Sequence, residues 1–490
     1  MKETTSMKKR IVAICMLAAL LLGMLGMVGC QPSVSTATPN FVVPEGGFDP
    51  TQEVTITFGH TMGQASMAIV DKYIKEFNKI YPNIKVEHVN KGGWGDINGT
   101  ITTEINGGTQ PNIVYCYPDH VAMYNLAKSV VTLDNLIASD LAVGDTGEIL
   151  GLTAEQKADF IESYYNEGTA FGDGLMYTMP FSKSTEILFY DADFFEKNNL
   201  TVPTTWEEMW EVCRQIKAID STCIPLGYDS ADNWFITMAE QMKSGYTDAS
   251  KTGEDRFTFD NEKNREFVEE LRGYYQEGLF TTKDLYGNYT SGLFTNQDPA
   301  KARCYLCIGS SGGTRHQTPK TEDEEGNTTY AFEVGIAPIP QYDANNKKAI
   351  SQGPSVCILK GNDTTDQQIM ASWLFVKYLC TDVAFQAEFS MDSGYMPVLK
   401  SVSENATYKA WLDGANGFDK LNALAVKVGI QERDTYFVSD AFNGSSVARV
   451  QAGSLLNKVV STELTGGMTI ENLINSAFTD AIDECIFQAG

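Results

Sequence analysis

The sequence predicts an α/β fold built as two lobes, and two observations support this prediction. First, apolar residues change period repeatedly between residues 54 and 117, in the order strand, helix, strand, helix, strand. Such alternation is typical of a mainly parallel sheet with helices on both faces. Second, roughly 435 residues follow the N-terminal segment, which is more than one hydrophobic core normally organises. We therefore expect two α/β lobes.

The first unit of the pattern contains three strands and two helices. Val54, Ile56 and Phe58 alternate with threonines, as in a half-buried strand, and later apolar residues recur at helical spacing until Pro82. The pattern places these five elements at 54–58, 69–81, 84–88, 97–105 and 113–117. Ligands of such sheets collect beyond the carboxyl ends of the strands. Those ends are at 59–61, 90–94 and 117–120.

A second unit begins with an apolar strand at 187–190. Thr205 and Glu208 have the spacing of a capping box, in which a hydroxyl and a carboxylate satisfy two free backbone donors at a helix start. The helix that follows is expected over 206–216. The remaining elements are two strands around a polar loop and one helix, at 334–340, 355–359 and 369–380. The acidic run at 322–325 is expected to be a solvated hairpin loop.

The N-terminus carries a targeting signal. Three cations at 8–10 precede an apolar run over 11–28 and then Cys30. This arrangement resembles a bacterial lipoprotein signal, which predicts a signal peptide at 1–29 and a lipid on Cys30. An uncleaved transmembrane helix is the alternative, although about 18 apolar residues is the short limit for a bilayer span. The polar stretch 30–53 is expected to be a flexible tether.

The charge of the chain excludes one class of partner. The formal net charge is −26, and such a surface repels nucleic acid. No stretch beyond the signal is long and apolar enough to span a bilayer. The chain also lacks a phosphate-binding loop of the nucleotide-hydrolase type.

Eight cysteines lie beyond Cys30. An exported protein could pair them, and Cys213 and Cys223, which flank one helix end, are the best candidates. Cys304 and Cys307 have the spacing of half a zinc site, but no second Cys or His pair follows at ligand spacing. We therefore expect these two to be core thiols in a strand, and we expect no metal site.

Four segments, in order, resemble the extracellular solute-binding proteins of ABC importers, in particular the carbohydrate type known as family 1. The segments are 172–181 leading into 188–191, then 202–208, then 335–340 ahead of Gly353, and finally 393–398. Within the family, the loops at 58–62 and 309–312 are most similar to the glycerol-3-phosphate-binding branch.

The resemblance implies a two-lobe, periplasmic-binding-protein-like (Venus flytrap) fold with hinge strands between the lobes. Lobe 1 would comprise 54–186 and 311–388, and lobe 2 would comprise 187–310 and 389–490. The implied protein is a monomer at the extracellular face of the cell membrane, anchored through the lipid on Cys30. It would capture a sugar, oligosaccharide or polyol between the lobes and deliver it to the transmembrane permease subunits. No cofactor is implied.

The candidate ligand-binding residues combine flat rings with polar groups, as a cleft for hydroxylated ligands requires. Rings are expected from Trp94, Trp234 and Tyr395, and partners for hydroxyls from His60, Asp119, Ser184 and Thr185. Arg449 would grip a phosphate or carboxylate, or pair with an acidic cleft residue when the ligand is neutral. Ser311 and Gly353 are either ligand contacts or hinge residues. For any single ring, core packing is the alternative role.

One departure from the family leaves the ligand open. Pro118 occupies the place where the glycerol-3-phosphate-binding branch has an acidic ligand residue, and Asp119 occupies the place where sugar binders have an aspartate. Binding of glycerol 3-phosphate or a glycerophosphodiester is therefore the alternative to sugar binding. A ligand sensor for a membrane receptor is a further alternative. A secreted glycoside hydrolase is another, because the two carboxylates of such an enzyme leave no sequence signature.

The segment 309–313 also fits the serine elbow of an esterase, with Ser311 as the nucleophile. That elbow requires a following helix, whereas 314–319 reads as a polar loop. The last histidine of the chain, His316, lies only five residues after Ser311, which does not suit the hydrolase order of nucleophile, acid and histidine. We therefore expect a binding protein and not an enzyme.

Overall fold

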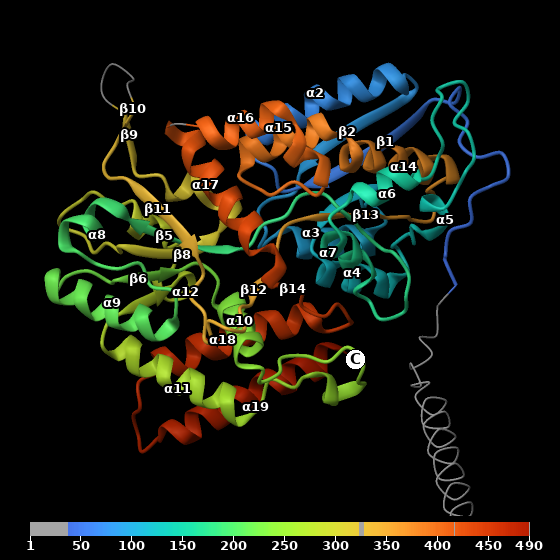
Figure 1. Cartoon of the computed structure of the whole chain (residues 1–490). Helices are drawn as coiled ribbons and strands as arrows, with labels where there is room; N and C mark the ends of the chain where they lie inside the picture. Colours follow the sequence, from blue (N-terminus) through green and yellow to red (C-terminus); the bar gives the residue numbers. More distant parts are fainter. Residues whose placement is uncertain (1–37, 323–327, 416, 490) are drawn as a thin grey trace, which may run out of the picture. The chain divides into compact units, whose positions relative to one another are not determined.

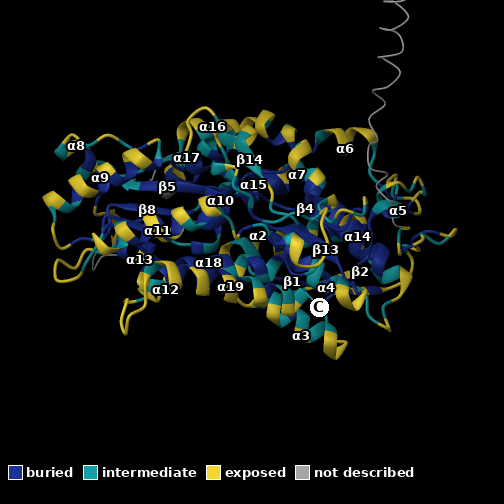
Figure 2. Cartoon of the chain, turned by 90° about the horizontal axis from the view of Figure 1, so that it is seen from below, coloured by how far each residue is buried: buried dark blue, intermediate teal, exposed yellow. Residues whose placement is uncertain are grey.

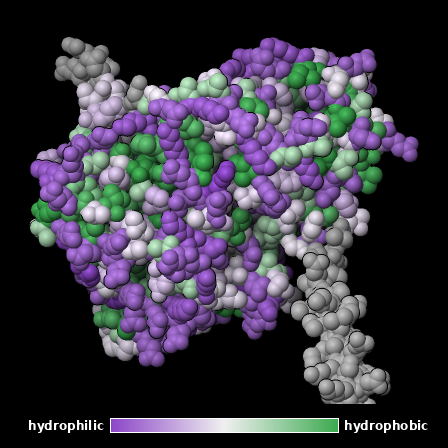
Figure 3. Space-filling model, in the orientation of Figure 1, coloured by the Kyte–Doolittle hydropathy of each residue, from purple (hydrophilic) through white to green (hydrophobic). Residues whose placement is uncertain are grey.

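The computed structural model describes residues 38–322, 328–415 and 417–489 (Figure 1). The predicted signal peptide 1–29 and the lipidation site Cys30 lie outside these residues, as does most of the acidic run 322–325. No helix within the described ranges combines the length and the apolar character that a bilayer span requires. On the face drawn in Figure 3 hydrophilic side chains predominate, in keeping with the net charge of −26.

The end of the predicted tether packs onto the protein. In the part of 30–53 that is described, Phe41 and Phe48 are buried in the first hydrophobic core. The backbone amide of Asn40 donates to Thr132 Oγ1 at 2.8 Å. The two phenylalanines bury apolar surface that a solvated tether would leave exposed, so the ordered part of the chain starts earlier than its composition suggested.

The first sheet has five strands in the order β2-β1-β3-β13-β4. Their bounds are β1 Val54–His60, β2 Ile84–Asn90, β3 Ile113–Cys116, β4 Met179–Pro180 and β13 Ser355–Ile358. Strand β1 pairs in parallel with β2 and β3, as the alternation predicted, whereas β13 runs antiparallel to β3 and β4. The sheet is therefore mixed, and β4 and β13 adjoin the segments that cross between the two sheets.

The second sheet has the order β11-β5-β8-β6-β7. Its strands are β5 Glu186–Asp191, β6 Leu226–Tyr228, β7 Phe280–Thr282, β8 Leu306–Ser310 and β11 Val334–Pro338. Strand β6 is parallel to β7 and β8, and β5 is antiparallel to β8 and β11. The strands expected around a polar loop, β11 and β13, therefore belong to different sheets. Strand β11 lies in the second sheet although 311–388 was assigned to lobe 1.

Two pairs of short strands stand apart from the main sheets. They are β9 Lys320–Glu322 with β10 Thr328–Tyr330, and β12 Ala349–Ile350 with β14 Tyr436–Phe437. The first pair is antiparallel and the second is parallel.

Helices from distant parts of the chain pack together around each sheet. Around the first core lie α2 Gln64–Ile80, α3 Ile97–Gly107, α4 Pro118–Tyr124, α5 Asp134–Ile137, α6 Ala154–Asp159, α7 Glu162–Asn166, α14 Asp366–Thr381, α15 Val383–Ser393, α16 Ala406–Gly414 and α17 Gly417–Glu432. Helix α2, blue in Figure 1, contacts the orange helices α14 and α15. The remainder are α8 Ala192–Asn198, α9 Trp206–Ile219, α10 Ala231–Met242, α11 Glu262–Gln276, α12 Lys283–Tyr286, α13 Ser291–Phe294, α18 Ser445–Ser461 and α19 Ile470–Ala489.

Each sheet has its own hydrophobic core, and strands β5 and β8 are buried along most of their length (Figure 2). The predicted capping box forms: Thr205 Oγ1 accepts from the Glu208 amide at 3.2 Å, and Glu208 Oε2 accepts from the Thr205 amide. Val398 and Tyr408 pack in the first core although 389–490 was assigned to lobe 2. The boundaries between the lobes stay a prediction.

The cysteines are buried and unpaired among the described residues. The pairing expected between Cys213 and Cys223 is therefore not formed. Cys213 lies on the buried face of α9 and packs as a small apolar side chain. Cys304 and Cys307 are core thiols at β8, as predicted, and the described residues contain no cluster of side chains that could hold a metal.

Several chain segments cross between the two sheets at one place. The Ser311 amide donates to the Thr185 carbonyl at 2.8 Å, and Thr185 Oγ1 donates to the Ile350 carbonyl at 2.9 Å. Beside them, Lys183 exchanges two backbone hydrogen bonds with Met396, at 2.9 and 2.6 Å. These bonds tie the crossing segments to one another, as expected of hinge strands.

Glu186 begins strand β5 at this crossing and is buried. Its Oε2 accepts a hydrogen bond from the Tyr228 hydroxyl at 2.6 Å. Burial, with a smaller contribution from Asp232, raises the pKa of Glu186 to about 8.

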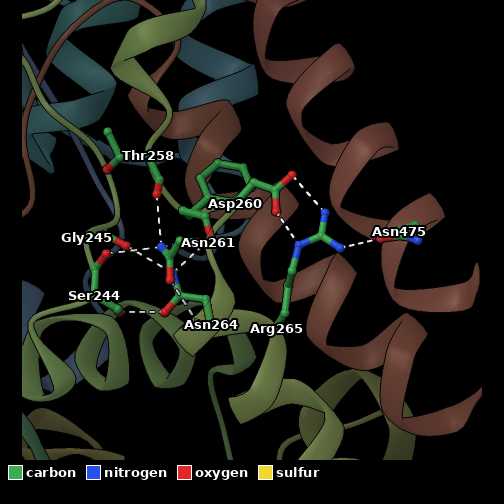
Figure 4. Close-up of polar contacts among 9 residues, drawn as sticks. Ser244, Gly245, Thr258, Asp260, Asn261, Asn264, Arg265 and Asn475 are labelled. Atoms are coloured by element: carbon green, nitrogen blue, oxygen red, sulfur yellow. Dashed lines mark hydrogen bonds and ion pairs between the residues drawn. The ribbon is translucent and has the colours of Figure 1, made fainter. Parts of the chain in front are cut away.

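The second lobe contains a polar network around the start of α11, away from this crossing (Figure 4). Asn264, which is fully buried, donates to the carbonyls of Gly245 and Phe259 and accepts from Ser244 Oγ at 2.6 Å. Next to it, Arg265 forms two hydrogen bonds with Asp260 and contacts Asn475 on α19. Since every polar group of the Asn264 side chain has a partner, the network avoids the cost of buried unpaired groups.

We expect Asn264→Ala to destabilise the protein by about 2–4 kcal/mol, because two carbonyls and one hydroxyl would lose their buried partner. The free energy of unfolding in urea measures this. The matched control is Asn472→Ala at an exposed position outside the network, which should change stability by less than about 0.5 kcal/mol. Equal effects of the two substitutions would contradict the importance of the network.

Glu186 should make stability depend on pH. Its folded-state pKa is raised, so its contribution is fully present below the unfolded pKa, about 4.5, and is lost as pH rises through about 8. The advantage of wild type over Glu186→Gln should shrink between these values by up to about 1.4 kcal/mol per pH unit. Urea unfolding at a series of pH values measures the difference. Glu404→Gln, at an exposed position, is the control, and a difference that does not change with pH would refute the assignment.

Candidate functional site

A cavity of about 770 Å³ lies between the ends of the two sheets. From the first sheet it is lined by residues that follow β1, β2 and β3, and from the second by residues that follow β6 and end β8. Thr61, Trp94 and Tyr117 all lie on its wall. Each comes from one of the three carboxyl ends predicted to collect ligands.

One wall of the cavity is aromatic. The ring of Trp94 stacks on Tyr117 with a centroid distance of 4.3 Å and on Tyr115 at 5.3 Å. Tyr395 lies against Gly312, where an added Cβ would stand 2.7 Å from the tyrosine ring. A side chain at this position would therefore force the Tyr395 ring to shift. Stacked rings offer flat apolar surface at low entropic cost.

Another part of the wall is polar and centres on Arg449 of α18. Arg449 Nε contacts Asp119 Oδ2 of α4 at 3.2 Å, and Arg449 Nη1 donates to Asn233 Oδ1 of α10 at 2.5 Å. Asp232 Oδ2 lies 3.7 Å from Arg449 Nη1. The pair with Asp119 joins the segment that follows the first sheet to a helix packed in the second core, so it bridges the cavity.

Charges on this wall stabilise one another. Burial disfavours the charged form of Asp119, but Arg449 and His120 outweigh it and keep the pKa of Asp119 below its usual value. Burial likewise opposes the charge on Arg449, while Asp119 and Asp232 raise its pKa above the ordinary range. Arg449 is therefore held as a cation between two carboxylates.

Four of the ten predicted site residues line the cavity, namely Trp94, Asp119, Tyr395 and Arg449. The structure does not bring the other six to the wall, and these are His60, Ser184, Thr185, Trp234, Ser311 and Gly353.

His60 is fully buried and bonds to other protein groups. Its Nε2 lies 2.8 Å from His88 Nδ1, and its Nδ1 accepts from the Met62 amide at 3.2 Å. Burial, followed by the neighbouring His88, lowers the pKa of His60 to about 4. His60 thus supports the loop after β1 and does not face the cavity.

Trp234 is buried in an aromatic cluster of the second lobe. Its ring stacks on Tyr228 at 4.5 Å and on Trp206 at 5.5 Å. The helical spacing of Trp234 on α10 turns it into the core, while the preceding Asp232 and Asn233 face the cavity. The core-packing alternative for this ring is therefore the one observed.

The other four residues belong to the crossing between the sheets. Ser311 Oγ accepts from the Thr185 amide at 3.2 Å, and Ser184 pairs through its backbone with Gln352. Gly353 has a φ of +99°, and a Cβ there would lie 2.7 Å from the Lys183 backbone. Their position fits the hinge role that the sequence left open for Ser311 and Gly353.

The esterase alternative gains no support from the geometry of Ser311. The segment after it is a 3₁₀ turn, η4 Ser311–Gln317, and not the helix that a nucleophile elbow requires. Ser311 is fully buried and is not on the cavity wall.

Several cavity residues were missed from the sequence. They include Tyr115, Tyr117, Glu186, Asp229, Asp232, Asn233 and Tyr289. Tyr117 lies within a predicted carboxyl end and could have been chosen. Asp229 and Asp232 follow β6, a strand of three residues, which is too short for its period to be recognised.

Comparison with known proteins agrees with the fold. Residues 72–414 match the profile of a family described as bacterial extracellular solute-binding protein. The sn-glycerol-3-phosphate-binding periplasmic protein UgpB of Yersinia enterocolitica is 24% identical over 377 residues, covering 74% of this chain and 78% of that protein. UgpB of Rhizobium meliloti is 24% identical over 359 residues, covering 70% and 75%.

Solved structures share the two-lobe α/β fold. UgpB from Mycobacterium tuberculosis in complex with glycerophosphocholine superposes with a TM-score of 0.68 at 16% identity, covering 89% of this chain and 99% of that one. An ABC substrate-binding protein from Listeria monocytogenes in complex with cycloalternan gives 0.66 at 16% identity, covering 88% and 99%. The predicted fold class is thereby confirmed. Since the family profile covers well over half of its length, the chain belongs to the bacterial extracellular solute-binding proteins.

Proposed function

We propose that this protein is the solute-binding component of an ABC importer and captures a neutral carbohydrate between its lobes. The observation that carries the proposal is the composition of the cavity, which combines an aromatic wall containing Trp94 with polar groups that include Asp119 and Asn233. Rings pack on the carbon faces of a sugar, and fixed carboxylates and amides accept and donate bonds to its hydroxyls.

The charges of the cavity favour a neutral ligand over a phosphate ester. Arg449 already pairs with Asp119 at 3.2 Å, and Arg315 pairs with Asp392 at 2.5 Å. The ammonium of Lys283 lies 4.4 Å from the centroid of the Tyr289 ring. A phosphate would have to compete with carboxylates for Arg449 and Arg315 and would meet further acidic residues on the wall.

Capture works through closure of the two lobes about the crossing segments. Trp94 and Asp119 belong to the first lobe, while Asn233 and Arg449 belong to the second. A ligand that bonds to both sets at once stabilises the closed form, because only those contacts differ between the open and closed states. The closed protein would then deliver the ligand, chemically unchanged, to the transmembrane permease subunits.

In this proposal, the N-terminal lipoprotein signal determines where the protein lies. A lipid on Cys30 would hold the protein, as a monomer, at the extracellular face of the cell membrane beside the permease. The relatives named above are binding proteins, and we propose that this chain likewise binds its ligand and does not act as an enzyme.

Titration calorimetry with neutral sugars and with sn-glycerol 3-phosphate tests the proposal. At least one neutral sugar should bind with a dissociation constant near 1 μM, or about −8 kcal/mol, and glycerol 3-phosphate should not. Trp94→Ala should weaken sugar binding at least tenfold, because the central ring of the aromatic wall is lost. Trp411→Ala is the matched control, since Trp411 is also partly buried but does not line the cavity. Unchanged affinity in Trp94→Ala, or conversion of the bound sugar, would overturn the proposal.

Glycerol 3-phosphate or a glycerophosphodiester is the second candidate ligand, favoured by Arg449 on the cavity wall and by the names of the curated relatives. If this candidate is right, Arg449→Ala should weaken binding of glycerol 3-phosphate at least tenfold, because a two-bond grip on the phosphate is lost. The same titration measures it. An unchanged affinity would remove Arg449 from phosphate binding.

A further inference from the structure

We infer that the cavity contains a second sugar position, formed by Tyr289 and Asp229, so that the ligand is an oligosaccharide of at least two rings. This inference rests on the proposed carbohydrate function. It comes from a repeated arrangement: an accessible ring beside a fixed carboxylate occurs twice on the cavity wall.

The first occurrence is the pair described above. Trp94, stacked on Tyr117, provides the ring, and Asp119, held by Arg449, provides the carboxylate. Both groups are fixed by neighbours before any ligand arrives. Fixed partners lose little freedom on binding, which is why such a pair suits one sugar ring.

Tyr289 provides the ring of the second occurrence. It lines the cavity and is 51% exposed, so its ring is accessible to a ligand. The ammonium of Lys283 lies 4.4 Å from its centroid and holds the ring in place from the end of β7 and the start of α12.

Asp229 provides the second carboxylate. Its Oδ1 accepts from both the amide and the hydroxyl of Thr290, each at 2.7 Å. Its Oδ2 stands 2.9 Å from where a Cβ would be at Gly309, another residue of the cavity wall. Thr290 adjoins Tyr289 in sequence, so the bonds that orient the carboxylate also anchor the segment that carries the ring.

The size of the cavity agrees with two positions. Its volume of about 770 Å³ lies in the upper part of the range, roughly 300–1,000 Å³, of pockets that bury most of a drug-sized ligand. A ligand as small as glycerol would leave most of this wall without contacts.

Titration calorimetry with three sugar ladders tests the inference. The ladders are glucose, maltose and maltotriose; glucose, cellobiose and cellotriose; and xylose, xylobiose and xylotriose. In at least one ladder, wild type should bind the two-ring sugar at least tenfold more tightly than the one-ring sugar. Tyr289→Ala and Asp229→Asn should each abolish that gain while changing the affinity for the single ring less than twofold.

Tyr286→Ala is the matched control. Tyr286 lies three residues before Tyr289 and is 44% exposed, but it does not line the cavity, so its loss should leave every affinity unchanged. Thermal unfolding of each variant separates loss of binding from loss of fold. Because Tyr289 is exposed, Tyr289→Ala should fold even if Asp229→Asn does not.

The outcomes separate this inference from the function on which it rests. Binding of sugars without dependence on length, or a gain that survives both substitutions, would overturn the second position alone. Failure of wild type to bind any member of any ladder would overturn the inference together with the proposed carbohydrate function.

Discussion

A buried ion pair lies where the two lobes join, and the surrounding structure is organised around it. Lys183 Nζ pairs with Glu167, and their side chains are 0% and 2% exposed. Removing one partner from such a pair leaves an uncompensated buried charge, which typically costs 3–5 kcal/mol. The backbone of Lys183 pairs with Met396, and Gly353 lies against it. The charge therefore holds in place the segments about which the lobes would turn.

The same crossing determines what the cavity presents to a ligand. Glu186 reaches the wall from a crossing segment and Glu167 from the 3₁₀ turn after α7, whereas Asp119 and Asp229 follow the ends of strands. Acceptors thus surround the cavity on several sides, and the cations among its described residues have acidic or aromatic neighbours. A ligand rich in hydroxyl donors matches such a surface better than an anion does.

Local sequence patterns predicted the individual elements well. The alternation over 54–117 identified three parallel strands and two helices, and the spacing of Thr205 and Glu208 identified a helix start. These features depend on neighbours along the chain. The partnership of β11 with β5 and of β13 with β3 depends on how the chain crosses between lobes, and no local period encodes that.

The site was harder to predict, because position in the chain does not determine the direction of a side chain. Trp94 and Arg449 reached the cavity, but Trp234 turned into an aromatic cluster one helical step away from Asn233. Ser311 lies beside the cavity, yet its hydroxyl is used by the Thr185 amide. Three-dimensional packing decides such cases, since it determines which polar groups are already satisfied.

The burial of the cysteines gives the folded protein chemical resistance. Burial raises the pKa of the Cys213, Cys380 and Cys485 thiols, and thiolates are the reactive form. An alkylating dye added from solution would therefore label these side chains only after the chain opens. The buried thiols therefore report on unfolding of the protein.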